Sequence, residues 1–131
     1  MISAAAIVAT AALSVAVPTG TFTTSISNAD LAAGHVTGSA VAASRGTYTL
    51  QLQPGGRWTM KNTAPGHLIN PTQGGTYRVA GSSVVFTNLF TGGTVTARLA
   101  LRAGVLRFTI LKASRPELRV VFGAHPWRKI G

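Results

Sequence analysis

The pattern of apolar and polar positions repeats every two residues from Gly20 onward. In Gly20–Ile26, the apolar Phe22 and Ile26 alternate with Thr21 and Thr23. A period of two places successive side chains on opposite faces of an extended chain. The segment is therefore predicted to be a β-strand with one buried face.

Three tight turns further along the chain predict β-hairpins. The first turn, Pro54-Gly55-Gly56, joins strands at 47–53 and 57–62. Its register puts two apolar pairs on one face, Leu52 with Trp58 and Leu50 with Met60. The opposite face of this hairpin carries threonine, glutamine and lysine.

The second and third hairpins turn at Gly81-Ser82 and Ala103-Gly104, which are two-residue turns of a type favoured between strands. Both registers again gather apolar pairs on one face: Val79 with Val84, Tyr77 with Phe86, Leu101 with Leu106, Leu99 with Phe108, and Ala97 with Ile110. A shift of one residue would reverse every face, so the agreement of three hairpins supports these registers. One apolar residue, Leu111, falls on the opposite face.

These segments, with a last strand at 126–130, predict an all-β fold: an antiparallel up-and-down barrel of about eight strands. Short helices are expected at 28–34, where Ser27 or Asn28 caps the start, and at 116–122. The longest stretch without strand character after the first hairpin is 63–74. Its Leu68 and Ile69 form either a lid over one end of the barrel, which we expect, or a small exposed contact patch.

Several short motifs recur at the predicted strands. Three strands open with glycine, threonine and an aromatic residue, and two further motifs accompany them: Gly20-Thr21-Phe22, Gly46-Thr47-Tyr48, Gly75-Thr76-Tyr77, Gly56-Arg57-Trp58 and the closing His125-Pro126-Trp127. On these motifs, residues 18–131 resemble the calycin superfamily, in particular the small lipocalin-like barrel domains of actinobacterial extracytoplasmic proteins.

This resemblance implies a barrel with a ligand cavity, found alone or beside a solute-binding domain, and it transfers no catalytic residue. It also implies that Arg128 packs on Phe22, which stands where lipocalins carry tryptophan. Residues 1–17 are uncharged and apolar, and we expect a signal-like or remnant segment there and a secreted or cell-envelope location.

Charge and composition narrow the function. Twelve Lys and Arg face only Asp30 and Glu117, which gives a net charge of +10, and there is no cysteine. Paired-carboxylate hydrolysis, thiolate chemistry and disulfide scaffolds are therefore disfavoured, and we expect no enzyme and no cofactor. The histidines lack metal-binding spacing, so no metal site is expected.

The inward-facing residues are the first candidate site. We expect a small apolar or aromatic ligand inside the barrel, with Trp58 or Tyr77 supplying polar anchoring. The remaining candidate ligand contacts are Phe86, Leu99 and Phe108. The alternative is that these side chains simply fill the barrel.

The outward-facing arginines are the second candidate site. Arg98, Arg102 and Arg107 share one face and suit an acidic macromolecule or an anionic membrane surface. Sequence-specific nucleic-acid binding is not expected, because the aromatic residues lie on the opposite face. A neutral interpretation is that these arginines only keep the surface soluble.

Overall fold

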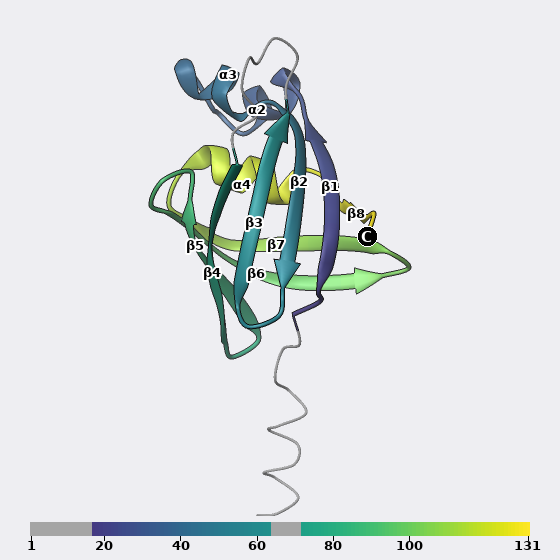
Figure 1. The fold of residues 1–131 in the computed structure, drawn as a ribbon. Helices are drawn as coiled ribbons and strands as arrows, with labels where there is room; N and C mark the ends of the chain where they lie inside the picture. Colours follow the sequence, from purple (N-terminus) through teal and green to yellow (C-terminus); the bar gives the residue numbers. More distant parts are fainter. Residues whose placement is uncertain (1–16, 64–71) are drawn as a thin grey trace, which may run out of the picture.

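The strands form one closed antiparallel barrel in sequence order (Figure 1), in a computed structural model that describes residues 17–63 and 72–131. Each strand pairs with its sequence neighbours, and the last strand pairs with the first. The predicted fold class is confirmed. The strands are β1 (Gly20–Ile26), β2 (Gly46–Gln53), β3 (Arg57–Thr63), β4 (Thr72–Ala80), β5 (Ser83–Leu89), β6 (Gly93–Arg102), β7 (Val105–Ala113) and β8 (Trp127–Lys129).

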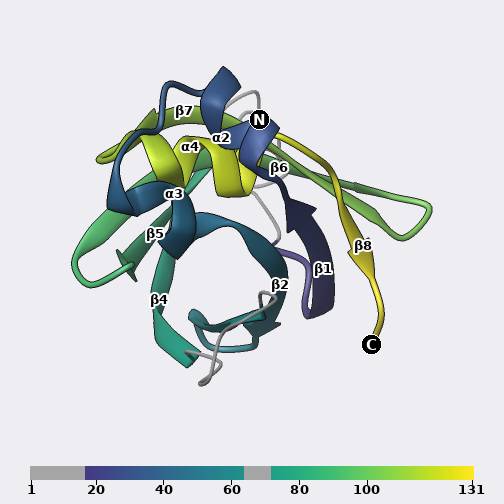
Figure 2. The same ribbon diagram turned by 90° about the horizontal axis from the view of Figure 1, so that it is seen from above.

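All three hairpin registers are confirmed, pair by pair. At the third turn, Ala103 and Gly104 have φ angles of 53° and 76°. Two positive φ values are what a type I′ turn requires, and this turn matches the twist of the strands it joins. The β6–β7 hairpin is long, and its tip projects away from the barrel in both views (Figures 1 and 2).

A β-bulge explains the one apolar residue that did not fit its face. On β6, Thr96 and Ala97 are consecutive, but their partners on β7 are Lys112 and Ile110. Leu111 is therefore the extra residue of a bulge, and its side chain is 45% exposed. Beyond the bulge the alternation resumes, so Lys112 joins the outward-facing arginines.

Within the described part of the chain, three short helices lie at one end of the barrel: α2 (Asn28–Ala33), α3 (Ser39–Ser44) and α4 (Pro116–Gly123) (Figures 1 and 2). Helices α2 and α4 agree with the prediction. Helix α3 was not predicted, because its cap residue, Gly38, makes no side-chain hydrogen bond and gives no sequence signal.

Aromatic side chains fill the helix-covered part of the barrel. Four of them contact one another with ring centroids 5.3–6.0 Å apart: Phe86, Phe108, Phe122 and Trp127. Phe122 and three other apolar residues of α4 are buried, so this helix closes its end of the barrel. The arrangement follows from the amphipathic character of α4, which buries its apolar face over the strand ends.

Some expectations differ from the structure, and others concern residues outside the part of the chain that the structure describes. Strand β4 begins at Thr72, inside the stretch predicted to be a loop, and β8 is shorter than predicted. Arg128 is exposed and pairs with Thr23 on the outside, whereas Phe22 is buried on the inside, so the implied packing of Arg128 on Phe22 is absent. Leu68, Ile69 and residues 1–16 lie outside the described residues. None of the described helices has the length and apolar character to cross a membrane.

Candidate functional site

The polar atoms of Trp58 and Tyr77 are both used inside the protein. The indole N–H of Trp58 donates to the carbonyl oxygens of Thr76 and Thr87, at 3.2 and 3.1 Å. The hydroxyl of Tyr77 donates to the carbonyl oxygen of Gln53 at 2.8 Å. These are the backbone partners that buried tryptophan and tyrosine need, so neither side chain holds a free donor N–H or O–H toward the interior.

The other three predicted interior residues lie in the same core. Phe86 is fully buried between Tyr77, Phe108 and Phe122, and Leu99 is partly buried against the core opposite Phe108. Phe108 differs from the others, because it also borders open space. Of the five residues predicted to contact a ligand, Phe108 therefore borders a groove that opens to solvent.

That groove, here the α2–α4 groove, is a depression open to solvent between the two helices and β7, with a volume of about 480 Å³. Its lining is mostly small or apolar, with one acid and one base: Ala33 and Gly34 from the end of α2, Phe108 and Ile110 from β7, Val120, Gly123 and Ala124 from α4, and the charged Asp30 and Arg119. The volume is within the range of small-molecule sites.

Two glycines let the walls of this groove come together. A methyl group on Gly34 would lie 2.2 Å from a methyl carbon of Val120, and one on Gly123 would lie 2.8 Å from a side-chain carbon of Ile110. Side chains at either position would therefore push α2 or α4 outward. The close approach of α2, α4 and β7 depends on these two positions being glycine.

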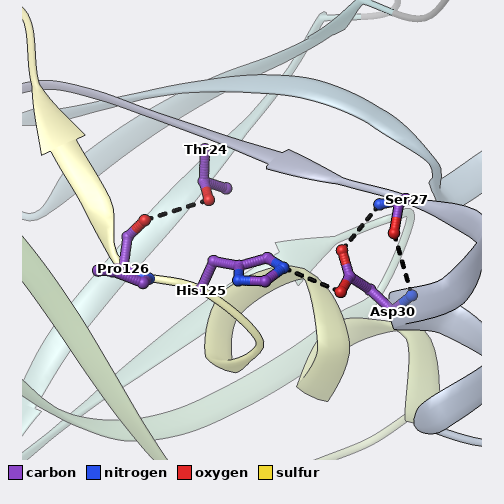
Figure 3. Close-up of polar contacts among 5 residues, drawn as sticks. All are labelled: Thr24, Ser27, Asp30, His125 and Pro126. Atoms are coloured by element: carbon purple, nitrogen blue, oxygen red, sulfur yellow. Dashed lines mark hydrogen bonds and ion pairs between the residues drawn. The ribbon is translucent and has the colours of Figure 1, made fainter.

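Polar contacts of Asp30 fix the rim of the groove (Figure 3). Ser27 and Asp30 form a capping box at the start of α2, in which the Ser27 N–H donates to Asp30 Oδ2 at 2.9 Å. The other carboxylate oxygen lies 2.9 Å from His125 Nε2, which links α2 to the segment after α4. The Ser27 backbone N–H is the main cause that lowers the pKa of Asp30, with burial opposing it and His125 adding to it.

The three predicted outer arginines share one face, as expected. Arg107 lies opposite Ala100, which places it diagonally between Arg98 and Arg102, and all three side chains are exposed. Arg102 and Arg107 also border a second groove of about 540 Å³ at the projecting tip, with Ala100, Leu101 and Val105. The structure therefore brings this set together, on the opposite side of the sheet from the aromatic core.

Sequence reasoning missed several residues that border cavities. Asp30, Gly34, Val120 and Gly123 come from helices far apart in sequence, and no local pattern joins them. Asn62 gave a usable signal: it follows Trp58 and Met60 at a spacing of two, so it is a polar residue on the inward face of β3. It is 5% exposed and borders another pocket.

Comparisons with known families, characterised proteins and solved structures gave no match. Within 17–63 and 72–131, no three His, Asp or Glu side chains are grouped in a way that could hold a metal ion.

Proposed function

We propose that this chain is a non-enzymatic, lipocalin-like binding module that takes a small apolar or aromatic molecule into the α2–α4 groove. The observation that carries the proposal is the groove itself: about 480 Å³ bordered by Phe108, Ile110 and Val120. The closed eight-stranded barrel supports the lipocalin-like description. The binding site lies at the helix-covered end, because the polar groups and rings of the central core already contact one another.

The lining favours a ligand with an apolar body. Aromatic and aliphatic side chains would bury such a body, and the charged Arg119, which borders the same groove, would orient one polar substituent. The proposal includes an accessory role beside a solute-binding domain, which the resemblance implies, and an extracytoplasmic location, which the apolar residues 1–17 favour.

A fluorescent apolar probe, N-phenyl-1-naphthylamine, tests the groove. Ala33 is exposed and borders the groove, whereas its neighbour Ala32 is exposed and does not. We expect Ala33→Trp to fill the groove and weaken probe binding by about tenfold or more, and Ala32→Trp to leave it unchanged. Absence of saturable probe binding, or equal binding by both variants, would contradict the proposal.

The projecting β6–β7 tip supports a second candidate function, a cationic module that binds an anionic membrane surface. Exposed Leu101 lies at the same tip as Arg102 and Arg107. An exposed apolar side chain and two guanidinium groups at one hairpin tip suit a surface that is both negatively charged and apolar beneath its headgroups. Neither acidic residue lies on this hairpin.

Vesicle sedimentation separates the two candidates. Under the second candidate, vesicles containing phosphatidylglycerol bind the protein at low salt and vesicles of phosphatidylcholine do not. The double variant Arg102→Gln with Arg107→Gln reduces this binding, while Ala33→Trp has no effect on it. Equal sedimentation of the wild type and the double variant would exclude a role for these arginines.

A further inference from the structure

One edge of the β6–β7 hairpin has no described strand beside it. The last pair between β5 and β6 near the tip is Val84 with Ala97, so residues 98–102 run beyond the part of β6 that β5 covers. The two hairpin tips point in different directions, and β5 does not follow β6 outward (Figure 1). On the other side of the hairpin, β8 pairs with β7 at Val105 and Leu106. Residues 98–102, here the β6 edge, are therefore unpaired on one side among the described residues.

The backbone groups that point out from the β6 edge belong to Leu99 and Leu101. Arg102 and Val105 form the pair next to the two-residue turn, and such a pair exchanges its N–H and C=O bonds. Because these groups point to alternate sides along a strand, Ala100 also bonds toward β7, whereas Leu99 and Leu101 point away from it. No turn, loop or cap hydrogen bond recorded for the described residues involves either leucine. The edge thus presents two N–H donors and two C=O acceptors.

The side chains along the β6 edge are positively charged on one face and apolar on the other. Arg98 and Arg102 are exposed on the outer face, and neither has an ion-pair partner within 17–63 and 72–131. Leu99 and Leu101 lie on the opposite face, and Leu101 is 42% exposed. A strand added at this edge would therefore meet arginine side chains on one face and leucine side chains on the other.

Charge determines which kind of strand fits the β6 edge. Directly opposite residues of two paired strands lie close enough for opposite charges to attract and like charges to repel. Antiparallel pairing with a second copy, centred on Ala100, would bring arginine opposite arginine at both ends, between two molecules of net charge +10. Charged residues on an edge strand oppose self-pairing in this way. An acidic segment would instead neutralise both Arg98 and Arg102.

We propose that the β6 edge binds an extended acidic peptide segment of a partner protein as an additional antiparallel strand. The backbone groups of Leu99 and Leu101 bond to the main chain of the peptide, and Arg98 and Arg102 pair with two of its carboxylates. The peptide residues opposite the two leucines are apolar. The preferred segment thus reads acid, apolar, any residue, apolar, acid. This interaction goes beyond both candidate functions, because it requires neither the α2–α4 groove nor a lipid surface.

A shorter edge on β4 offers a comparison within the same molecule. Beyond the bond from the Tyr77 N–H to the Gly56 carbonyl, no described pair joins β4 to β3. Ala80 and Ser83 form the pair next to the β4–β5 turn, so Val79 is the residue there whose backbone groups point outward. Val79 is 45% exposed, which is close to the value for Leu101. A single residue offers too few hydrogen bonds to hold a strand, so Val79 is a matched control position.

NMR titration of the ¹⁵N-labelled full chain tests the proposal with the peptide acetyl-Gly-Glu-Val-Thr-Val-Glu-Gly-amide. We expect saturable shifts of the Leu99 and Leu101 backbone amide signals and slower exchange of both protons with solvent. The same peptide with N-methyl groups on both valines keeps its charge but loses the N–H groups that would face β6. It should bind at least tenfold more weakly. Equal binding of the two peptides would mean that charge alone attracts them, and would overturn the proposal.

Variants of the protein locate the site. Leu101→Pro removes one outward N–H and leaves the bonds to β7 in place, so it should weaken peptide binding at least tenfold. Val79→Pro makes the same change at the β4 edge and should leave binding unchanged. Because the methylated peptide tests the same hydrogen bonds on the unaltered protein, the proposal stays testable if Leu101→Pro does not fold. Equal weakening by the two proline variants, with both folded, would place the peptide elsewhere and overturn the proposal.

A double variant tests the acidic character of the peptide. Arg98→Gln with Arg102→Gln should weaken binding by about tenfold at low salt, and Arg57→Gln with Lys61→Gln should not, although it removes the same charge from the exposed face of β3. Sedimentation velocity without peptide examines the alternative occupant. A dimer that Leu101→Pro abolishes would assign the β6 edge to a second copy of this chain and overturn the proposal.

Discussion

At the scale of single residues, the buried aromatic side chains direct their polar atoms to backbone carbonyl oxygens. Trp58 and Tyr77 do so within the sheet, and Trp127 donates to the carbonyl of Phe122 at 3.3 Å. Tyr48 donates to Ser44 at 2.6 Å. A buried N–H or O–H requires such a partner, and here the strands and helix ends provide it. The buried aromatic side chains consequently keep no free donor for a ligand in the central core, and ligand sites are left to its edges.

Tyr48 should make stability fall at alkaline pH. Burial raises the pKa of its hydroxyl well above the ordinary value of 10. Above pH 10 the unfolded chain loses this proton and the folded protein keeps it, so the free energy of unfolding falls by about 1.4 kcal/mol per pH unit. Denaturant unfolding of the wild type and of Tyr48→Phe from about pH 9 to about pH 11, the range in which free tyrosine titrates, measures how the free energy of unfolding of each depends on pH. Parallel pH profiles for the two proteins would contradict the assignment.

The indole ring of Trp58 depends on the glycine opposite it. Trp58 pairs with Gly75, where an added methyl group would lie 2.4 Å from the Thr87 carbonyl oxygen and 3.0 Å from the indole ring. We expect Gly75→Ala to lower the free energy of unfolding by about 1–3 kcal/mol. The neighbouring Gly74→Ala meets its nearest atom at 3.2 Å and should cost less. Urea denaturation of both variants checks the order, and a larger loss for Gly74→Ala would refute it.

At the scale of secondary-structure elements, the alternation of side chains determines which face each strand buries. The bulge at Leu111 is the local irregularity that lets β7 keep Phe108 and Ile110 on its core-directed face and Ala113 against Val95. Without an extra residue, one end of the strand would have the wrong face inward. Leu111 is exposed because it is the extra residue between two segments of β7 that each pair regularly with β6.

Deletion of single residues on β7 tests this interpretation. Removing Leu111 should leave both regular segments paired as before, so the variant should fold with a loss of stability within about 3 kcal/mol. Removing Arg107 instead should turn Phe108 outward, away from the aromatic rings it contacts, and prevent cooperative folding. Circular dichroism with thermal denaturation distinguishes the two variants. Equal tolerance of both deletions would show that the bulge does not fix the register.

The sequence predicted the elements far better than the sites. Hairpin registers are local, and Leu52 with Trp58 or Leu99 with Phe108 can be derived from turn chemistry and alternation alone. The grooves are not local, because they join the end of α2 to residues of α4 and β7 more than seventy positions away in sequence, as Gly34 meets Val120. Phe108 was found because it is a core residue, and Asn62 was missed although it interrupts an apolar face.

At the scale of the whole molecule, positive charge is distributed over the outside of a closed apolar barrel. The net charge is +10, and the arginines on the β6–β7 face lie close to one another. Arg107 is diagonal to both Arg98 and Arg102, so this face contains like charges at distances where repulsion counts. A surface of this kind attracts anionic partners and destabilises the folded state at low salt.

Removing the central arginine should therefore stabilise the protein. We expect Arg107→Gln to raise the free energy of unfolding by about 0.5 kcal/mol at low salt, because it relieves two diagonal repulsions. The gain should disappear near 1 M salt, where the screening length is about 3 Å. Lys61→Gln, which faces Thr49 and Thr72, is the matched control and should show no such gain. Urea denaturation at both salt concentrations measures the effect. A gain that persists at high salt would mean that Arg107 acts through packing, and the electrostatic account of this face would fail.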